Sequence, residues 1–203
     1  MKRSAAFILA ALSTFSVNSW AGPSDLYVGL DVFGSKNDFH YDFPGGSENH
    51  SIDGSGFKLK LGVLLQNDLR LQGYFLSETF DDAPFPPPSY HGSNELLGEI
   101  GLDLIKEFIV SPSLSPFIQG GIGFGAMDLD PAYYYDDVVG EVNLKVGLGL
   151  MVRITPVLEL LGGLDFQWRQ WGKVNYEDSV YGYSTQETDD TSRRFYLGAN
   201  LHF

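Results

Sequence analysis

The sequence lacks cysteine, and it has half as many basic residues as acidic ones. Without cysteine, the chain can form neither a disulfide nor a thiolate metal site. Its 26 acids against 13 bases give a net charge of −13, which would repel the phosphates of a nucleic acid. We therefore exclude nucleic acid as a partner and expect a fold that needs no cross-link, metal or cofactor.

Long apolar runs are also scarce. Lys2 and Arg3 precede a short apolar stretch, which ends in the small-x-small cleavage motif Ser19-Trp20-Ala21. This pattern predicts a signal peptide, residues 1–21, and a mature domain, residues 22–203. Beyond the cleavage site no run reaches the length of about 18 apolar residues that a membrane-spanning helix needs, so any crossing must use strands.

Glycine and aromatic residues are abundant, with 24 Gly, 15 Phe and 11 Tyr. From Val138 to Arg153, apolar residues alternate with polar or small ones, and a period of two over this length predicts a β-strand. The same alternation predicts an all-β chain with eight strands, at about residues 26–34, 56–65, 69–78, 94–105, 116–127, 138–153, 157–168 and 191–203.

The connections between these strands alternate in length. Long polar connections follow the odd-numbered strands, at residues 35–55, 79–93, 128–137 and 169–190. Two of the other three connections are tight turns. Short turns at one rim and long loops at the other are typical of membrane barrels. We therefore predict an eight-stranded antiparallel up-and-down transmembrane β-barrel.

The polar side of the predicted strands carries seven acids and six bases, interspersed with Gly and Gln, and we assign this side to the lumen. These residues are Asp31, Lys58, Lys60, Arg70, Glu95, Glu99, Asp103, Glu141, Lys145, Arg153, Glu159, Asp165 and Arg194. Buried charges are stable when they are paired, and eight strands leave an interior that side chains just fill. We expect a charge network that plugs the lumen; a narrow gated channel through the same groups is the alternative. The pairs predicted from neighbouring strands are Arg70–Asp103, Arg153–Glu159 and Asp165–Arg194.

The apolar side, assigned to lipid, carries aromatic residues near the strand ends, as the aromatic girdles of membrane barrels do. These residues are Phe57, Phe75, Phe124, Phe166, Trp168, Phe195 and Phe203.

The last strand ends on an aromatic residue, after alternating apolar ones. The alternating residues are Phe195, Leu197, Ala199, Leu201 and Phe203. This ending resembles the signal by which bacterial outer-membrane proteins are recognised for insertion. With the eight strands, the chain resembles the small outer-membrane barrels of the OmpA/OmpX type, also described as opacity-like barrels. The resemblance implies the outer membrane of a Gram-negative cell, the barrel-assembly machinery as a partner during insertion, contact with outer-membrane lipid and lipopolysaccharide, and a monomer.

One segment carries residues of a catalytic type. Period two places His91, Ser93 and Glu95 on one side of the fourth strand, the residue set of a base, a nucleophile and an orienting acid. The segment resembles the His-x-Ser of outer-membrane lipid A deacylases. Glu95, however, shares the lumen register, where a lipid ester would not reach. We predict no enzymatic activity and no catalytic residue; a hydrolase of lipid A or phospholipid is the alternative.

The long connections, counted together with Glu78 at the end of the third predicted strand, hold 16 of the 26 acids, Asp190 among them. Asp128 and Asp130 lack the spacing of an EF-hand, so we predict no specific metal site. Tyrosines gather in two of these connections, and tyrosine is favoured at recognition surfaces. We therefore predict a structural or envelope role, or a surface-contact role in which the loops bind an extracellular protein or glycan.

Overall fold

The computed structural model describes residues 26–203, except residues 44, 83, 86–95, 130–135 and 179–181. The predicted signal peptide therefore lies outside the described residues, as do His91, Ser93 and Glu95. Among the described residues, no helix is long and apolar enough to cross a membrane.

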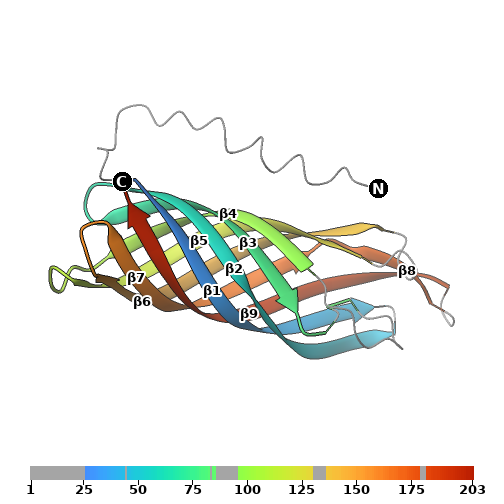
Figure 1. Cartoon of the computed structure of the whole chain (residues 1–203). Helices are drawn as coiled ribbons and strands as arrows, with labels where there is room; N and C mark the ends of the chain where they lie inside the picture. The colour runs from blue at the N-terminus through green and yellow to red at the C-terminus, as the bar shows by residue number, and fades with distance from the viewer. Residues whose placement is uncertain (1–25, 44, 83, 86–95, 130–135, 179–181) are drawn as a thin grey trace.

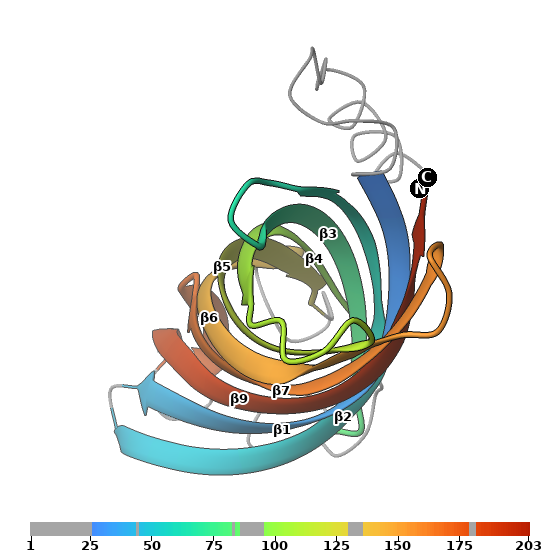
Figure 2. The same cartoon turned by 90° about the vertical axis from the view of Figure 1, so that its left-hand side faces the viewer.

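The described residues form a closed barrel of antiparallel strands (Figures 1 and 2). The strands are β1 (Leu26–Phe43), β2 (Gly46–Leu64), β3 (Leu69–Phe80), β4 (Leu96–Glu107), β5 (Leu114–Asp128), β6 (Val138–Arg153), β7 (Leu158–Trp171), β8 (Val174–Asp178) and β9 (Gly182–His202). The strands β1 to β7 each pair with the next one, and β7 pairs with β9. β9 returns to pair with β1 from Tyr27↔His202 to Asp42↔Glu187, which closes the wall.

β7 and β8 act as one interrupted strand. β8 pairs with Gly182–Gln186 of β9, beyond the part of β9 that pairs with β7, and Gly172 and Lys173 separate the two. Counted around the wall, the barrel has eight strands. The predicted all-β fold and eight-stranded antiparallel barrel are therefore confirmed.

The two ends of the barrel differ. At one end, which we call the short-turn end, the turn between β2 and β3 places Asn67 and Asp68 at φ of 62° and 55°. Asn and Asp tolerate this left-handed backbone better than other residues with a side chain. At the other end, the hairpin end, β1, β2, β8 and β9 extend farther than their neighbours (Figure 1).

The prediction of loops at residues 35–55 and 169–190 is wrong, because most of both ranges form strands. β1 and β2 continue to Phe43 and from Gly46, and β9 begins at Gly182 instead of residue 191. The alternation persists there with its faces exchanged, since Phe39 and Tyr41 are buried inside the barrel while charged residues point outward. A polar outer face concealed these strands from an analysis that expected apolar residues outside.

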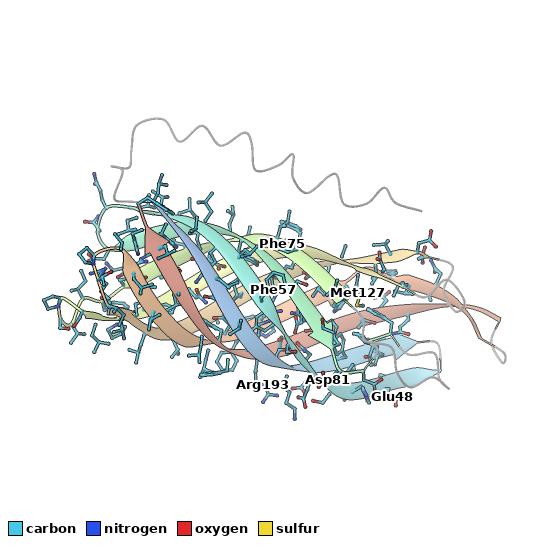
Figure 3. All side chains as sticks on the ribbon, viewed as in Figure 1. Glu48, Phe57, Phe75, Asp81, Met127 and Arg193 are labelled. Carbon is cyan, nitrogen blue, oxygen red and sulfur yellow. The ribbon has the colours of Figure 1, made fainter. Side chains whose placement is uncertain are left out.

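The outer face of the wall is apolar over the middle of every strand. Each strand exposes large apolar side chains, for example Leu30, Leu61, Leu71, Ile100, Ile122, Leu148, Leu164 and Leu197. Figure 3 shows Phe57 and Phe75 on this wall, and Asp81 and Glu48 farther toward the hairpin end. The ring centroids of Phe57 and Phe75 are 6.4 Å apart. Apolar surface of this extent is rare on soluble monomers and matches the lipid-facing band of membrane barrels.

Inside the wall, aromatic rings lie over glycines of the neighbouring strand. Five buried rings each have glycine as their direct cross-strand partner: Tyr27–Gly62, Phe33–Gly56, Tyr74–Gly101, Phe117–Gly149 and Tyr196–Gly163. A Cβ added to Gly62 would lie 2.2 Å from Tyr27, so glycine leaves the space that the ring occupies. This pairing explains why glycine is frequent on the lumen side of strands, where it otherwise weakens a sheet.

Candidate functional site: the filled lumen

The lumen contains most of the buried charge of the described residues, nine acids and six bases. Eleven of the thirteen predicted lumen residues are buried: Asp31, Lys58, Lys60, Arg70, Glu99, Asp103, Glu141, Lys145, Glu159, Asp165 and Arg194. Arg153 is partly exposed, and Glu95 lies outside the described residues. The analysis of the sequence missed Glu78, Glu107, Arg169 and Asp190.

At the short-turn end, Arg70 is fully buried and holds two carboxylates. Its two terminal nitrogens donate to the two oxygens of Glu159, each at 2.8 Å, and its Nε donates to Glu107. Two parallel bonds of this kind are the strongest geometry between arginine and a carboxylate. Arg153 adds contacts of 3.3 Å to Glu107 and 3.7 Å to Glu159, so four charged side chains form one layer.

The middle of the lumen holds three lysines between two aspartates. Lys145 lies 2.7 Å from Asp103, and Lys58 lies 3.5 Å from Asp31 and 3.8 Å from Asp103. Lys60 also donates to Asp31. The Nζ of Lys145 lies 3.9 Å from the centre of the Tyr74 ring, close enough for a cation–π contact.

Toward the hairpin end, Glu78 accepts hydrogen bonds from two arginines. Arg169 donates to Glu78 at 2.6 Å and Arg194 at 2.5 Å. Ser35 donates to the other oxygen of Glu78. Arg169 also lies 3.5 Å from Asp190. This third layer is built largely from residues that the sequence placed in loops.

Two of the three predicted ion pairs are wrong. Arg70 contacts Glu159 and not Asp103. Asp165 and Arg194 are direct cross-strand partners, yet their side chains turn to other groups: Arg194 to Glu78 on β3, and Asp165 to Gln119 on β5. In a narrow barrel, long side chains reach strands across the lumen, which a prediction from neighbouring strands cannot include. The third predicted pair, Arg153–Glu159, is present.

Beyond the third layer, apolar side chains close the hairpin end. They are Phe39, Tyr41, Ile52, Phe80, Phe85, Leu97, Met127, Leu129, Val139, Trp171 and Val174, and we call this cluster the apolar cap. Phe85 comes from the connection after β3, and its ring stands edge-on to Trp171 with centroids 5.3 Å apart. Tyr41 donates to the carbonyl of Pro84 at 2.6 Å, which holds this connection against the barrel.

The space left inside is small. A cavity of about 10 Å³, lined by Asp31, Lys60 and Asn200 among others, has room for about one water molecule. In the part of the chain that the structure describes, no group of three or more His, Asp or Glu could hold a metal ion. Among the described residues, three charged layers and an apolar cap therefore fill the lumen.

The residues of the predicted insertion signal lie on the outer wall of β9 and at its end. Phe195, Leu197 and Leu201 are exposed, Ala199 lies between them, and Phe203 follows β9 with 63% of its surface exposed. This side of β9 is apolar and is available to lipid. Its role as an insertion signal stays a prediction.

The outer face beyond the apolar band is charged. Arg193 forms an ion pair with Asp38, and Ser51 donates to Asp38 at 2.8 Å. The hydrogen bond from Ser51 and the nearby guanidinium of Arg193 lower the pKa of the Asp38 carboxyl below its usual range. Asp38 and Arg193 lie outside the apolar band and mark where it ends.

The sequence matches the family model described as outer membrane protein beta-barrel domain over residues 7–203. No curated protein matches it. Among solved structures, Neisserial surface protein A (NspA) is 19% identical, with a TM-score of 0.54, over 88% of this chain and 97% of that one. OprG, an outer membrane protein from Pseudomonas aeruginosa, is 9% identical, with a TM-score of 0.56, over 91% of this chain and 99% of that one.

At these identities the two solved structures support the fold alone. The family match covers nearly the whole sequence, and the apolar outer wall and the closed eight-stranded topology agree with it. The predicted resemblance to small outer-membrane barrels and the predicted location in the outer membrane are confirmed. The chain belongs to the outer membrane protein β-barrel family.

Proposed function

We propose that this protein is a closed outer-membrane barrel, with a structural or surface-contact role instead of a pore function. One observation carries the proposal: the lumen is filled along its length, by three layers of paired charge and by the apolar cap. An ion entering it would have to break ion pairs such as Arg70–Glu159, and breaking a buried pair is costly.

The direct test is conductance. Purified protein refolded into planar bilayers is expected to give no discrete current steps above those of a protein-free bilayer, with an open porin measured in parallel to show that insertion is detected. Reproducible openings of the wild-type protein would contradict the closed-lumen proposal and favour the gated channel.

The part of the barrel beyond the apolar band supports a surface role. In barrels of this class, short turns face the periplasm and longer connections face the outside, so the hairpin end is extracellular. Its outward-facing side chains are largely acidic and include Asp42, Glu187 and Asp189. We propose that this end contacts an extracellular protein or glycan, while the wall contacts outer-membrane lipid and lipopolysaccharide.

A strain that lacks the protein separates the two roles. It is complemented with the wild type or with the variant D42N/E187Q/D189N, which leaves the lumen and the lipid-facing wall unchanged. If both restore resistance to detergent, the role is structural. If the wild type restores binding of cells to protein and glycan arrays and the variant does not, the acidic end makes the contact. A deletion that changes neither property would contradict both roles.

We propose a non-enzymatic role as well. The buried carboxylates of the described lumen are engaged by bases or amides or enclosed by the wall, and they are out of reach of a lipid ester. The alternative rests on His91 and Ser93. Ser93→Ala is expected to leave the acyl pattern of lipid A unchanged in mass spectra, and an altered pattern would support the hydrolase.

A further inference from the structure

The periplasmic rim is apolar on one side and polar on the other. The connection between β4 and β5 carries three consecutive exposed apolar residues, Phe108, Ile109 and Val110, at 47%, 55% and 69% exposure. The turn between β2 and β3, by contrast, exposes one apolar residue, Leu65, and then Gln66, Asn67 and Asp68. Both connections lie at the same end of the barrel, so their different composition needs a physical reason.

The apolar tip, which we define as Phe108–Val110, projects past its neighbour β3. The pairing of β3 with β4 ends at Leu69↔Lys106, whereas the hairpin with β5 continues through Phe108, whose N–H donates to Pro116 at 2.8 Å. The tip is therefore an ordered extension of the hairpin. The tip extends from the hairpin of β4 and β5, and β6 is the next strand of the wall on that side.

Both faces of the tip are apolar. Phe108 and Val110 continue the outward register of Leu104, which faces lipid, while Ile109 continues the inward register of Glu107. Ile109 is nevertheless exposed, because the filled lumen ends at Glu107. Exposed apolar side chains gathered in this way are typical of a surface that contacts lipid or protein and not water alone.

The tip is continuous with the lipid-facing wall. Lys106 is the one charged residue between Leu104 and Phe108 on the outward face, and its Nζ turns to the carbonyl of Asn67, 2.5 Å away. On the other side, the N–H of Arg153 donates to Ser113, and the exposed Ile154 and Val157 follow in the next turn. Exposed apolar residues are thus found on the wall, in the tip and in the turn between β6 and β7, and Ser113 lies between the tip and that turn.

We propose that the apolar tip and the turn with Ile154 lie in the lipid of the inner leaflet, at the boundary of headgroups and acyl chains. The turn between β2 and β3 stays in the periplasmic water. The barrel then enters the bilayer more deeply on the β4–β7 side than on the β2–β3 side. The partner of this surface is phospholipid, and the position of the exposed apolar tip directly after the lipid-facing residues of β4 carries the assignment.

The sequence has no cysteine, so each introduced cysteine is the single site that a thiol-reactive spin label can modify. Ile109→Cys and Val110→Cys probe the tip, Ile154→Cys the next turn, Gln66→Cys the polar turn, and Leu148→Cys the middle of the wall. Each labelled protein is refolded into vesicles of phosphatidylethanolamine and phosphatidylglycerol. Collision rates with oxygen, which concentrates in lipid, and with a water-soluble nickel chelate are then compared.

At residues 109, 110 and 154 we expect oxygen to dominate, as at residue 148, and at residue 66 the chelate to dominate. A ratio at residues 109 and 110 like that at residue 66 would overturn the proposal. Low collision rates with both reagents at the tip would also overturn it, because they would indicate burial against protein. All five positions are exposed, so the labels leave the lumen packing intact, and a mobility shift between boiled and unboiled samples checks each fold.

Discussion

Arg70 shows at the scale of one residue how the lumen is stabilised. It is fully buried, and Glu159 and Glu107 both depend on it. Arg70→Gln leaves these carboxylates without their main partner, and breaking a buried pair in this way costs about 3–5 kcal/mol. We expect a loss of that order in the free energy of unfolding, measured by urea titration of tryptophan fluorescence in lipid vesicles.

Two matched variants control this prediction. Lys173→Gln removes the exposed pair with Glu187, and exposed pairs contribute about 0–1 kcal/mol. Arg153→Gln removes a partly exposed cation from the same layer as Arg70, so its cost is expected to lie between the other two. Equal stability of the Arg70 and Lys173 variants would mean that the lumen charges do not hold the barrel together.

At the scale of the element, strand β4 contains a test of the pairing between rings and glycines. A Cβ on Gly101 would lie 2.4 Å from the hydroxyl oxygen of Tyr74 and equally close to a backbone carbonyl, whereas a Cβ on Gly98 meets nothing within 4 Å. Overpacking of this kind costs about 1–3 kcal/mol. We expect Gly101→Ala to lower the unfolding free energy by this amount and Gly98→Ala to leave it unchanged or slightly raised.

The same urea titration compares the two alanine variants. Because both positions lie on β4 and both variants add one methyl group, strand propensity cancels in the comparison. A result in which Gly98→Ala is the more damaging variant would show that the ring does not need the glycine.

At this scale, the strands were predictable where the outer face stayed apolar and the inner face stayed polar or small. The middle of β6 follows the alternation expected of a wall strand, and its predicted bounds, 138–153, match the structure. The end of β1 escaped prediction because the outside is water there and the inside is the apolar cap. The first part of β9 escaped prediction because it is polar on both faces, with Gln186, Thr188 and Asp190 buried inside. Asp190 was therefore placed in a loop, although it is buried.

At the scale of the whole molecule, two kinds of residues fill the described lumen, the charged layers and the apolar cap. Phe85→Ala removes a fully buried ring from the cap, a change that costs about 3–5 kcal/mol in a packed core. Since the layers around Arg70 and Lys145 do not touch this ring, we expect a less stable barrel that still gives no current in planar bilayers. Current steps in Phe85→Ala that the wild type lacks would show that the cap alone closes the lumen.

The alternation of the chain determined by itself that this protein is an eight-stranded barrel with an apolar outside. Alternation with a period of two assigns each residue to one face of its strand. The residue types on a face then indicate whether that face contacts lipid or the lumen. The partners inside the lumen were decided by the tertiary structure alone. Closing the wall places β3 opposite β7 across the lumen. Arg70 therefore contacts Glu159, and Glu78 contacts Arg169. Such contacts cannot be predicted from the pairing of adjacent strands.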